Sequence, residues 1–536
     1  MLRMKKAVLC FFATLMGILT ATIPLGTHAD DLVLADKGTS SYQIVVPDDT
    51  GDPVVNEALH QTARLVQHAF NVSGFDVAIV AEKERDADMP GIFLGDTSFA
   101  RTNGCDPRTL EGWNYFHKVV ENNVIIAGRD HAPPDLSHLG DWGRFFYYRL
   151  GTLKAAADFL RLYTDTFFLY PGGNRIPAHG AQSVRKWTFD NPGIAFTQQD
   201  AVKVPADLDL RKNVFPRYHK RHHRYALLYD VANNFFPRVD DALLAHTYGK
   251  AIPPKEYREK NPDCFALLGG KRTERNQYCL SNAQVRERIY QFTAGFLEAG
   301  CESVNILQPD GFRPCQCKAC HALYGTGDDW GEKLWIFHRN IARRLKKNHP
   351  EKKLLISPYT VTLEPPESFD RFPDNVIISH VDANFQETEK WKKWRKLHKG
   401  EYGIWLHNWV ANQTSRYTAQ RTPLFVEKQV RFFHDYNVHG VYRDGLGEVF
   451  GQEGPTYYIF GRMFDDPETL DAKTLMFEFC DAAFGDAAGV MRRFYDTLYH
   501  NIELYALYLN THGDGWSYTD IYGRGHKAVQ DPFRML

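Results

Sequence analysis

Short apolar runs alternate with amphipathic segments along the first part of the chain. Strands are predicted over residues 42–46, 75–80, 91–94 and 123–127. Helices are predicted near residues 56–70 and over 151–163, where Leu153, Ala156 and Leu160 recur at helical spacing. The pattern predicts a small α+β domain over residues 30–190, which ends in turns rich in Pro and Gly.

The rhythm changes after about residue 193 to apolar strands separated by longer helical stretches. Strands are predicted over residues 225–229, 303–307, 353–357, 375–379, 403–406 and 439–442. Strands that alternate with helices indicate parallel βαβ units, and this number of units favours a closed barrel over an open sheet. We therefore expect an α/β chain with a TIM-like (β/α)8 barrel over residues 191–467 and a helical C-terminal segment over 468–536.

The N-terminus has the pattern of a secretory signal peptide. Three basic residues precede an apolar stretch over 7–25, and small residues then offer a cleavage site before Asp30. Pro24 and Gly26 interrupt the stretch, which favours cleavage after residue 29 over an uncleaved anchor. The sequence predicts an exported protein, periplasmic or extracellular, with no membrane attachment after cleavage.

Composition narrows the class of partner. The formal net charge of −1 argues against a broad surface for nucleic acid or an acidic membrane. Aromatic residues make up 14% of the chain. Their faces can stack on sugar rings or fill large cores, so an oligosaccharide or polysaccharide is the expected substrate and the oligomeric state stays open.

Carboxylates follow two of the predicted barrel strands. Asp310 follows strand 303–307 and Asp444 follows strand 439–442, with Glu448 nearby. Parallel barrels carry their active sites at these strand ends, and glycosidic cleavage needs an acid plus a group that stabilises or attacks the sugar carbon. We predict Asp310 and Asp444 as the catalytic pair, with Glu448 as a substitute; the alternative is that each Asp caps the next helix.

Other polar and aromatic residues at the strand ends are predicted to bind substrate. They are Tyr359, His380, Asp382, Trp405, His407, Asn408, Trp409 and Arg443. The two Trp side chains either stack on sugar or pack under neighbouring loops. No cofactor is expected for catalysis.

Three cysteines lie within six residues directly after Asp310. Cys315, Cys317 and Cys320 form a C-x-C-x-x-C run, and Cys279 or His321 is the candidate fourth partner. Disulfides are the default for paired cysteines in an exported protein, whereas the spacing also matches a structural zinc site. The sequence leaves both open, and either would pin the loop that carries Asp310.

Several segments resemble known carbohydrate-active families. Residues 149–160 and 168–172 resemble the N-terminal domain that precedes the barrel in α-glucuronidases and β-hexosaminidases. The DUF4838 domain family is similar over residues 253–257, 261–266, 270–272, 279–282, 310–320 and 454–467. The cysteine motif is the most specific part of this resemblance, which runs over most of the chain.

The resemblance implies a function as well as a fold. Members of glycoside hydrolase family 163 are endo-β-N-acetylglucosaminidases that act on complex N-glycans. In such an enzyme the 2-acetamido group can serve as internal nucleophile, polarised by one carboxylate while another acts as acid. Where the family tends to have Glu-Gly at the late strand, this chain has Asp444 and Gly445, so its activity can differ.

The leading hypothesis is a retaining glycoside hydrolase for a β-linked glycan, with N-acetylhexosamine as one candidate sugar. One alternative is a polysaccharide lyase for uronate-containing glycans, with His407 or Tyr359 as base. The other is a barrel that binds glycan without catalysis, because fold alone does not establish activity.

Overall fold

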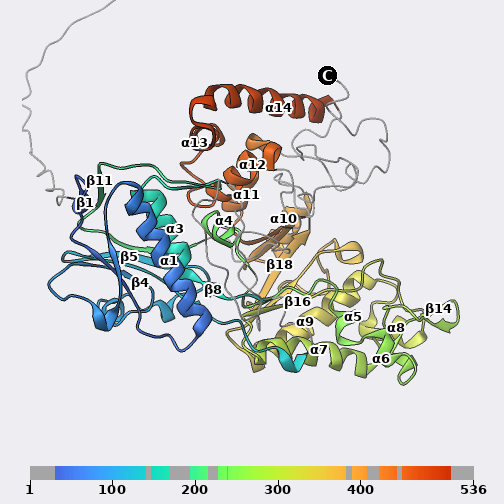
Figure 1. Cartoon of the computed structure of the whole chain (residues 1–536). Helices are drawn as coiled ribbons and strands as arrows, with labels where there is room; N and C mark the ends of the chain where they lie inside the picture. The colour runs from blue at the N-terminus through green and yellow to red at the C-terminus, as the bar shows by residue number, and fades with distance from the viewer. Residues whose placement is uncertain are drawn as a thin grey trace, which may run out of the picture.

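The protein has two regions, each organised around a sheet of six strands (Figure 1). The computed structural model describes residues 31–139, 146–169, 193–214, 227–237, 239–381, 389–406, 422–443 and 450–508. Within these residues no helix is both long and apolar enough to cross a bilayer. The predicted signal peptide lies outside them.

The N-terminal sheet is mixed, with the strand order β12-β5-β6-β4-β2-β3. Its strands are β2 (Gln43–Val46), β3 (Ala78–Ala81), β4 (Gly91–Leu94), β5 (Tyr115–Val120), β6 (Asn123–Gly128) and β12 (Asp209–Lys212). Strands β3, β2, β4 and β6 run parallel, while β5 pairs antiparallel with both β6 and β12. The parallel part follows from the helical connections that the pattern predicts.

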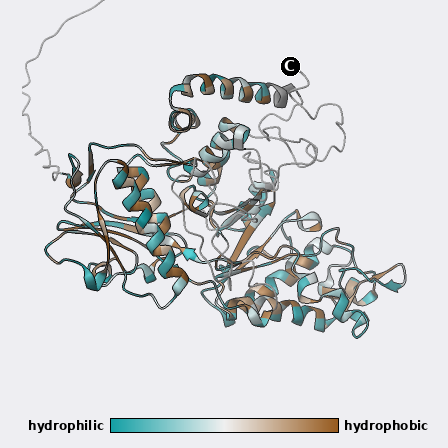
Figure 2. Cartoon of the chain, viewed as in Figure 1, coloured by the Kyte–Doolittle hydropathy of each residue, from teal (hydrophilic) through white to brown (hydrophobic). Residues whose placement is uncertain are grey.

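Two helices, α1 (Pro53–Val72) and α3 (Gly151–Tyr163), lie side by side against one face of this sheet (Figure 1). Asp52 caps α1 by accepting hydrogen bonds from the amides of Val54 and Val55. Figure 2 shows both hydrophobic and hydrophilic residues on α1, as expected for an amphipathic helix, and its buried residues include Leu59 and Phe70.

The start of α3 crosses the end of β6 at very short range. A Cβ atom on Gly128 would come within 2.2 Å of the backbone of Gly151, and one on Gly151 would come within 2.6 Å of the backbone of Arg129. Both positions therefore require glycine, because no side-chain adjustment relieves a backbone clash.

Segments after residue 190 pair with strands of the N-terminal region, in a separate two-stranded sheet and at the edge of the six-stranded one. Strand β11 (Ala201–Val204) pairs with β1 (Leu32–Asp36), and β12 pairs with β5. These segments return to the first domain because they complete edges that would otherwise expose unpaired backbone groups.

The second sheet is entirely parallel, and its order β13-β16-β17-β18-β19-β20 is the order of the strands in the sequence. The strands are β13 (Asp241–Ala242), β16 (Ser303–Ile306), β17 (Lys353–Ile356), β18 (Val376–Val381), β19 (Tyr402–Leu406) and β20 (Val438–Arg443). The helices between them are α7 (Ala283–Glu298), α9 (Trp330–Asn348), α10 (Glu389–Leu397) and α11 (Pro423–Asp435).

The two faces of this sheet differ. Leu354 and Ile356 belong to the large core shared with the helices, whereas Leu355 belongs to a separate small cluster on the opposite face. This small inner cluster consists of Leu243, Leu355, Ile377, Trp405 and Tyr442. Because side chains alternate along a strand, the strands are buried on both sides, as in barrel-type α/β proteins.

The structure of this region differs from the sequence-based predictions in two respects. Residues 227–229 of the strand expected at 225–229 belong to helix α4 (Leu227–Ala232), and the first strand of the sheet is the two-residue β13 (Asp241–Ala242). The described residues show a curled parallel sheet of six strands, and the closed (β/α)8 barrel stays a prediction. The expected helical C-terminal part is present as α13 (Ala472–Phe484) and α14 (Ala488–Tyr508), after α12 (Phe450–Met463).

A network of charged side chains, hereafter the domain junction, joins the two regions. Asp158 of α3 accepts hydrogen bonds from Lys154 at 2.8 Å and Arg161 at 2.9 Å. Asp465, which follows α12, pairs with Arg161 at 3.6 Å and with Arg462 at 2.9 Å. The charges are buried or nearly so, and each pairs with an opposite charge as burial requires.

Candidate functional site

Asp310 lies in the turn that follows β16, with its side chain exposed. Its Oδ1 atom accepts hydrogen bonds from the Tyr359 hydroxyl at 2.7 Å and from the Gly311 amide at 2.9 Å. The next helix, α8 (Lys318–Ala322), is capped by Cys317. Asp310 therefore does not cap that helix, and its carboxylate faces a neighbouring strand end.

Tyr359 follows β17, and hydrogen bonds made by its backbone amide and carbonyl hold it in place. Its amide donates to the Thr362 hydroxyl at 3.0 Å, and its carbonyl accepts from the buried Gln308 side chain at 2.7 Å. Gln308 also donates to Thr362 at 3.1 Å. Two neighbouring strand ends thus hold the Tyr359 phenol in position beside Asp310.

His246 also lies beside Tyr359 and Gln308, although the sequence pattern does not predict it as a site residue. Its Nδ1 atom lies 2.7 Å from the Gln308 carbonyl oxygen, and its ring centroid lies 5.7 Å from that of Tyr359. It comes after β13, whose two residues give no periodic signal, so the sequence offers little to find it by. His246, Gln308, Asp310 and Tyr359 thus come from the carboxyl ends of three adjacent strands.

A cavity of about 440 Å³ opens beside Asp310. One wall is the loop from Asp310 to Arg313, and the other includes the hairpin of β14 (Leu267–Leu268) and β15 (Lys271–Arg272). Gln277 joins the walls, because its amide nitrogen lies 3.4 Å from the Asp310 carbonyl oxygen and its Oε1 accepts from the Arg313 amide at 2.9 Å.

The described lining of this cavity is strongly basic. It contains Lys271, Arg272, Arg275 and Arg313 but a single carboxylate, that of Asp310. Arg272 pairs with Asp263 at 3.1 Å, on the other side of the hairpin. A ligand that carries negative charge would be attracted to such a lining.

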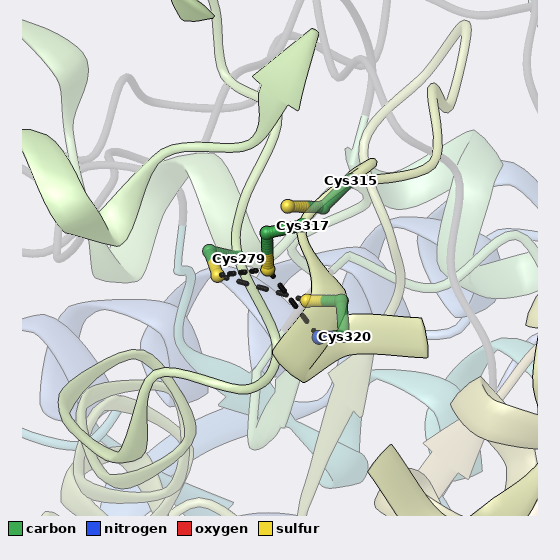
Figure 3. A group of neighbouring side chains, drawn as sticks. All are labelled: Cys279, Cys315, Cys317 and Cys320. Atoms are coloured by element: carbon green, nitrogen blue, oxygen red, sulfur yellow. Dashed lines mark hydrogen bonds between the residues drawn. The ribbon is translucent and has the colours of Figure 1, made fainter. Parts of the chain in front are cut away.

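The predicted cysteines lie close together (Figure 3), in segments that adjoin the cavity lining: Cys279 is two residues after Gln277 and Cys315 two residues after Arg313. The Sγ atoms of Cys279, Cys315, Cys317 and Cys320 all lie within 4.8 Å of one another. Hydrogen bonds from Cys315 and Cys320 lower the pKa of the Cys279 thiol. The other candidate partner, His321, instead contacts Asp328 at 2.9 Å on the surface.

Two other predicted substrate-binding residues have different surroundings. His380 is buried, with its ring 4.3 Å from Trp391 and 5.9 Å from Tyr402, so it packs against α10 in the outer core. Trp405 is 8% exposed and lies 4.0 Å from the Tyr442 ring in the inner cluster.

The remaining predicted site residues fall elsewhere. Asp382, His407, Asn408, Trp409, Asp444 and Glu448 lie outside the described residues, as does the side chain of Arg443. The separation between Asp310 and the second predicted carboxylate therefore stays a prediction.

Comparison with known proteins agrees with this architecture. Residues 192–496, more than half of the chain, match the family described as a domain of unknown function, DUF4838. The chain belongs to this family. No curated protein sequence gives a significant match.

Among solved structures, the chain is similar to a family GH115 4-O-methyl-α-glucuronidase, BtGH115A, with specificity for decorated arabinogalactans. The TM-score is 0.50 at 12% identity, over 88% of this chain and 62% of that enzyme, so the chain spans less than two thirds of its length. A family 89 glycoside hydrolase from Clostridium perfringens is more distant, with a TM-score of 0.37 at 9% identity over 82% of this chain and 53% of that one. At 12% identity, the similarity to the GH115 enzyme supports a related fold for this chain.

Proposed function

We propose that the protein is an exported glycoside hydrolase whose active site lies at the carboxyl ends of β13, β16 and β17. The observation that carries this proposal is the hydrogen bond between Tyr359 and Asp310 beside an open cavity. Ligands of parallel α/β sheets bind at this edge, because the loops there converge. The domain arrangement, shared with a glycoside hydrolase, supports the same class.

The contacts of Asp310 suggest its role. Two donors, the Tyr359 hydroxyl and the Gly311 amide, both point at Oδ1 and stabilise a negative carboxylate. Asp310 is therefore assigned to the positive charge that develops on the sugar carbon, either directly or by polarising a 2-acetamido group. Protonation of the leaving oxygen is assigned to Asp444, with Glu448 as its substitute.

The substrate that fits is a β-linked glycan, with N-acetylhexosamine as one candidate sugar. The basic wall formed by Lys271, Arg275 and Arg313 favours a glycan that also carries a carboxylate or sulfate. The same wall supports the second candidate, a lyase for uronate-containing polysaccharide, in which cations neutralise the uronate and Tyr359 acts as base. A non-catalytic glycan-binding protein is the third.

A hydrolase adds water to the bond that it cleaves, whereas a lyase cleaves by elimination without water. The mature chain is incubated with a complex N-glycan glycoprotein, with β-linked N-acetylhexosamine oligosaccharides and with uronate polysaccharides, in heavy-oxygen water. A hydrolase places the heavy oxygen at the new reducing end of its product. A lyase leaves it out and gives an unsaturated sugar, and a binding protein gives no product.

Asp310→Asn tests the assigned carboxylate on whichever substrate is cleaved. Turnover should fall about 100-fold or more, because positioned carboxylates contribute about 10²–10⁴-fold. Asp374→Asn is the matched control, since Asp374 is an exposed surface partner of Lys346. Unchanged turnover in the Asp310 variant would remove this residue from the mechanism.

A further inference from the structure

The four clustered thiols have the spacing of a tetrahedral metal site. Cys279 Sγ lies 3.7 Å from Cys317 Sγ and 3.6 Å from Cys320 Sγ. Zinc bound by thiolates at ~2.3 Å in a tetrahedron places neighbouring sulfurs about 3.8 Å apart. A disulfide instead requires about 2.05 Å. The separations therefore match four ligands around one ion.

Backbone amides surround this cluster in the way that supports bound thiolates. The Leu267 amide donates to Cys315 Sγ at 3.2 Å, and the Ser281 amide donates to Cys320 Sγ at 3.3 Å. The Cys320 amide donates to Cys317 Sγ at 3.3 Å. Such N–H groups compensate negative charge on sulfur and orient the ligands. Three of the four sulfurs thus have an outer partner that a disulfide would not need.

The cysteines outside this group provide an internal comparison. Cys105 and Cys480 are also buried, and burial is the largest cause that raises the pKa of each thiol to about 11. Neither belongs to a group of potential metal ligands among the described residues. Among the described residues, the four clustered thiols form the group that combines short mutual distances with amide donors.

We propose that Cys279, Cys315, Cys317 and Cys320 bind one zinc ion in a closed structural site. Four protein ligands leave no position for water or substrate, which is the pattern of structural and not catalytic zinc. The inference does not depend on the proposed function.

The position of the site indicates what the ion does. It connects the β14–β15 hairpin through Leu267, the segment before α7 through Cys279, and the loop after Asp310 through Cys315. Gln277, two residues before Cys279, holds the Asp310 loop from the other side. Zinc would thus fix both walls of the cavity at their base.

The first measurement is the metal content of the full mature chain, purified without chelator. We expect one zinc ion per chain by elemental analysis. Replacement of zinc by Co²⁺ should give the charge-transfer absorption of a tetrahedral thiolate site. Chain that contains no zinc after expression with added zinc would overturn the proposal.

A second measurement separates zinc from disulfides without relying on a variant. The denatured chain is alkylated in the presence of chelator and absence of reductant, and the peptides are weighed. All four cluster cysteines should carry the label, whereas peptides joined by disulfides would overturn the proposal.

Cys317→Ser and Cys105→Ser then localise the ion. Cys317 is the least buried ligand, so its variant has the best prospect of folding. We expect Cys317→Ser to lose zinc and Cys105→Ser to keep one ion per chain. Equal zinc content in both variants would place the metal elsewhere.

Discussion

The domain junction and the Asp310 site both gather charged residues, but they arrange them in opposite ways. At the junction, Lys154, Asp158 and Arg161 are at most 9% exposed, and Asp158 forms ion pairs with both cations. At the Asp310 site, a carboxylate and several cations line an open cavity. A buried network that lost a member would leave an uncompensated charge, whereas an open one can accept a ligand.

The comparison separates residues that hold the domains together from residues that are available for chemistry. Changes at the junction should alter the free energy of unfolding and leave the chemistry of the site intact. Changes at the Asp310 site should alter turnover with little effect on unfolding. The following variants test whether stability and turnover depend on these two separate groups of residues.

The largest effect is expected from Asp465→Ala at the junction. Burial alone would raise the pKa of Asp465, but the charges of Lys154, Arg161 and Arg462 lower it, which shows how strongly they stabilise the carboxylate. Without it, Asp158 and Glu478 remain as partners of these three cations, so one buried positive charge is left uncompensated. The loss should cost about 3–5 kcal/mol of unfolding free energy. Chemical denaturation measures this value. Glu468→Ala, on the surface nearby, should cost about 0.5 kcal/mol or less; equal losses would contradict the comparison.

Acid should also weaken the N-terminal region, through His117. This side chain is buried beside α3, where its Nε2 lies 2.8 Å from the Ala155 carbonyl oxygen, and burial lowers its pKa to about 4. Unfolded chains bind a proton near pH 6.5, so this contribution is present above pH 6.5 and is lost as the pH falls to about 4. The loss should reach about 3 kcal/mol. Unfolding measured against pH should show a flatter slope for His117→Gln, and an unchanged slope would exclude this histidine.

A smaller effect is expected at the Asp310 site from Tyr359→Phe. The variant keeps the ring but removes the hydroxyl that donates to Asp310. Turnover should fall about 10-fold, as expected for loss of one hydrogen bond to a charged group. Thermal unfolding should barely change. Tyr257→Phe provides the control, and a large stability loss in Tyr359→Phe with normal turnover would assign Tyr359 to folding instead.

The smallest effect is expected from Arg313→Gln in the cavity. If the substrate is anionic, KM should rise a few-fold at low salt, and the difference should shrink as salt screens the charge. Arg493→Gln, on the exposed side of α14, should leave KM unchanged. An effect that is independent of salt would argue against recognition of a charged group.

Much of the fold follows from local pattern. The helix predicted over residues 151–163 is α3, and the apolar run predicted at 353–357 is β17. Both have continuous hydrophobic signals of the right period. The strand prediction at 225–229 was wrong for its last three residues, because so short an apolar run does not distinguish a buried helix from a strand. Strand β5 was missed because His117 and Lys118 interrupt its apolar pattern.

The candidate site was less accessible to prediction, since it depends on contacts between strand ends. Asp310 and Tyr359 are separate features in the sequence, and only the pairing of β16 with β17 brings them together. The cysteine spacing could not distinguish Cys279 from His321 as fourth partner. That choice depends on how the segment before α7 returns to the Asp310 loop.

The pairing of β1 with β11 has a consequence for how the chain folds. The parallel sheet can grow by adding each strand to the one synthesised before it. The N-terminal region cannot, because β1 and one edge of β5 pair with strands at residues 201–212. Contacts so distant in sequence slow folding. This region is therefore not complete until β11 and β12 have been synthesised, and a nascent chain that ends before them exposes open strand edges to chaperones.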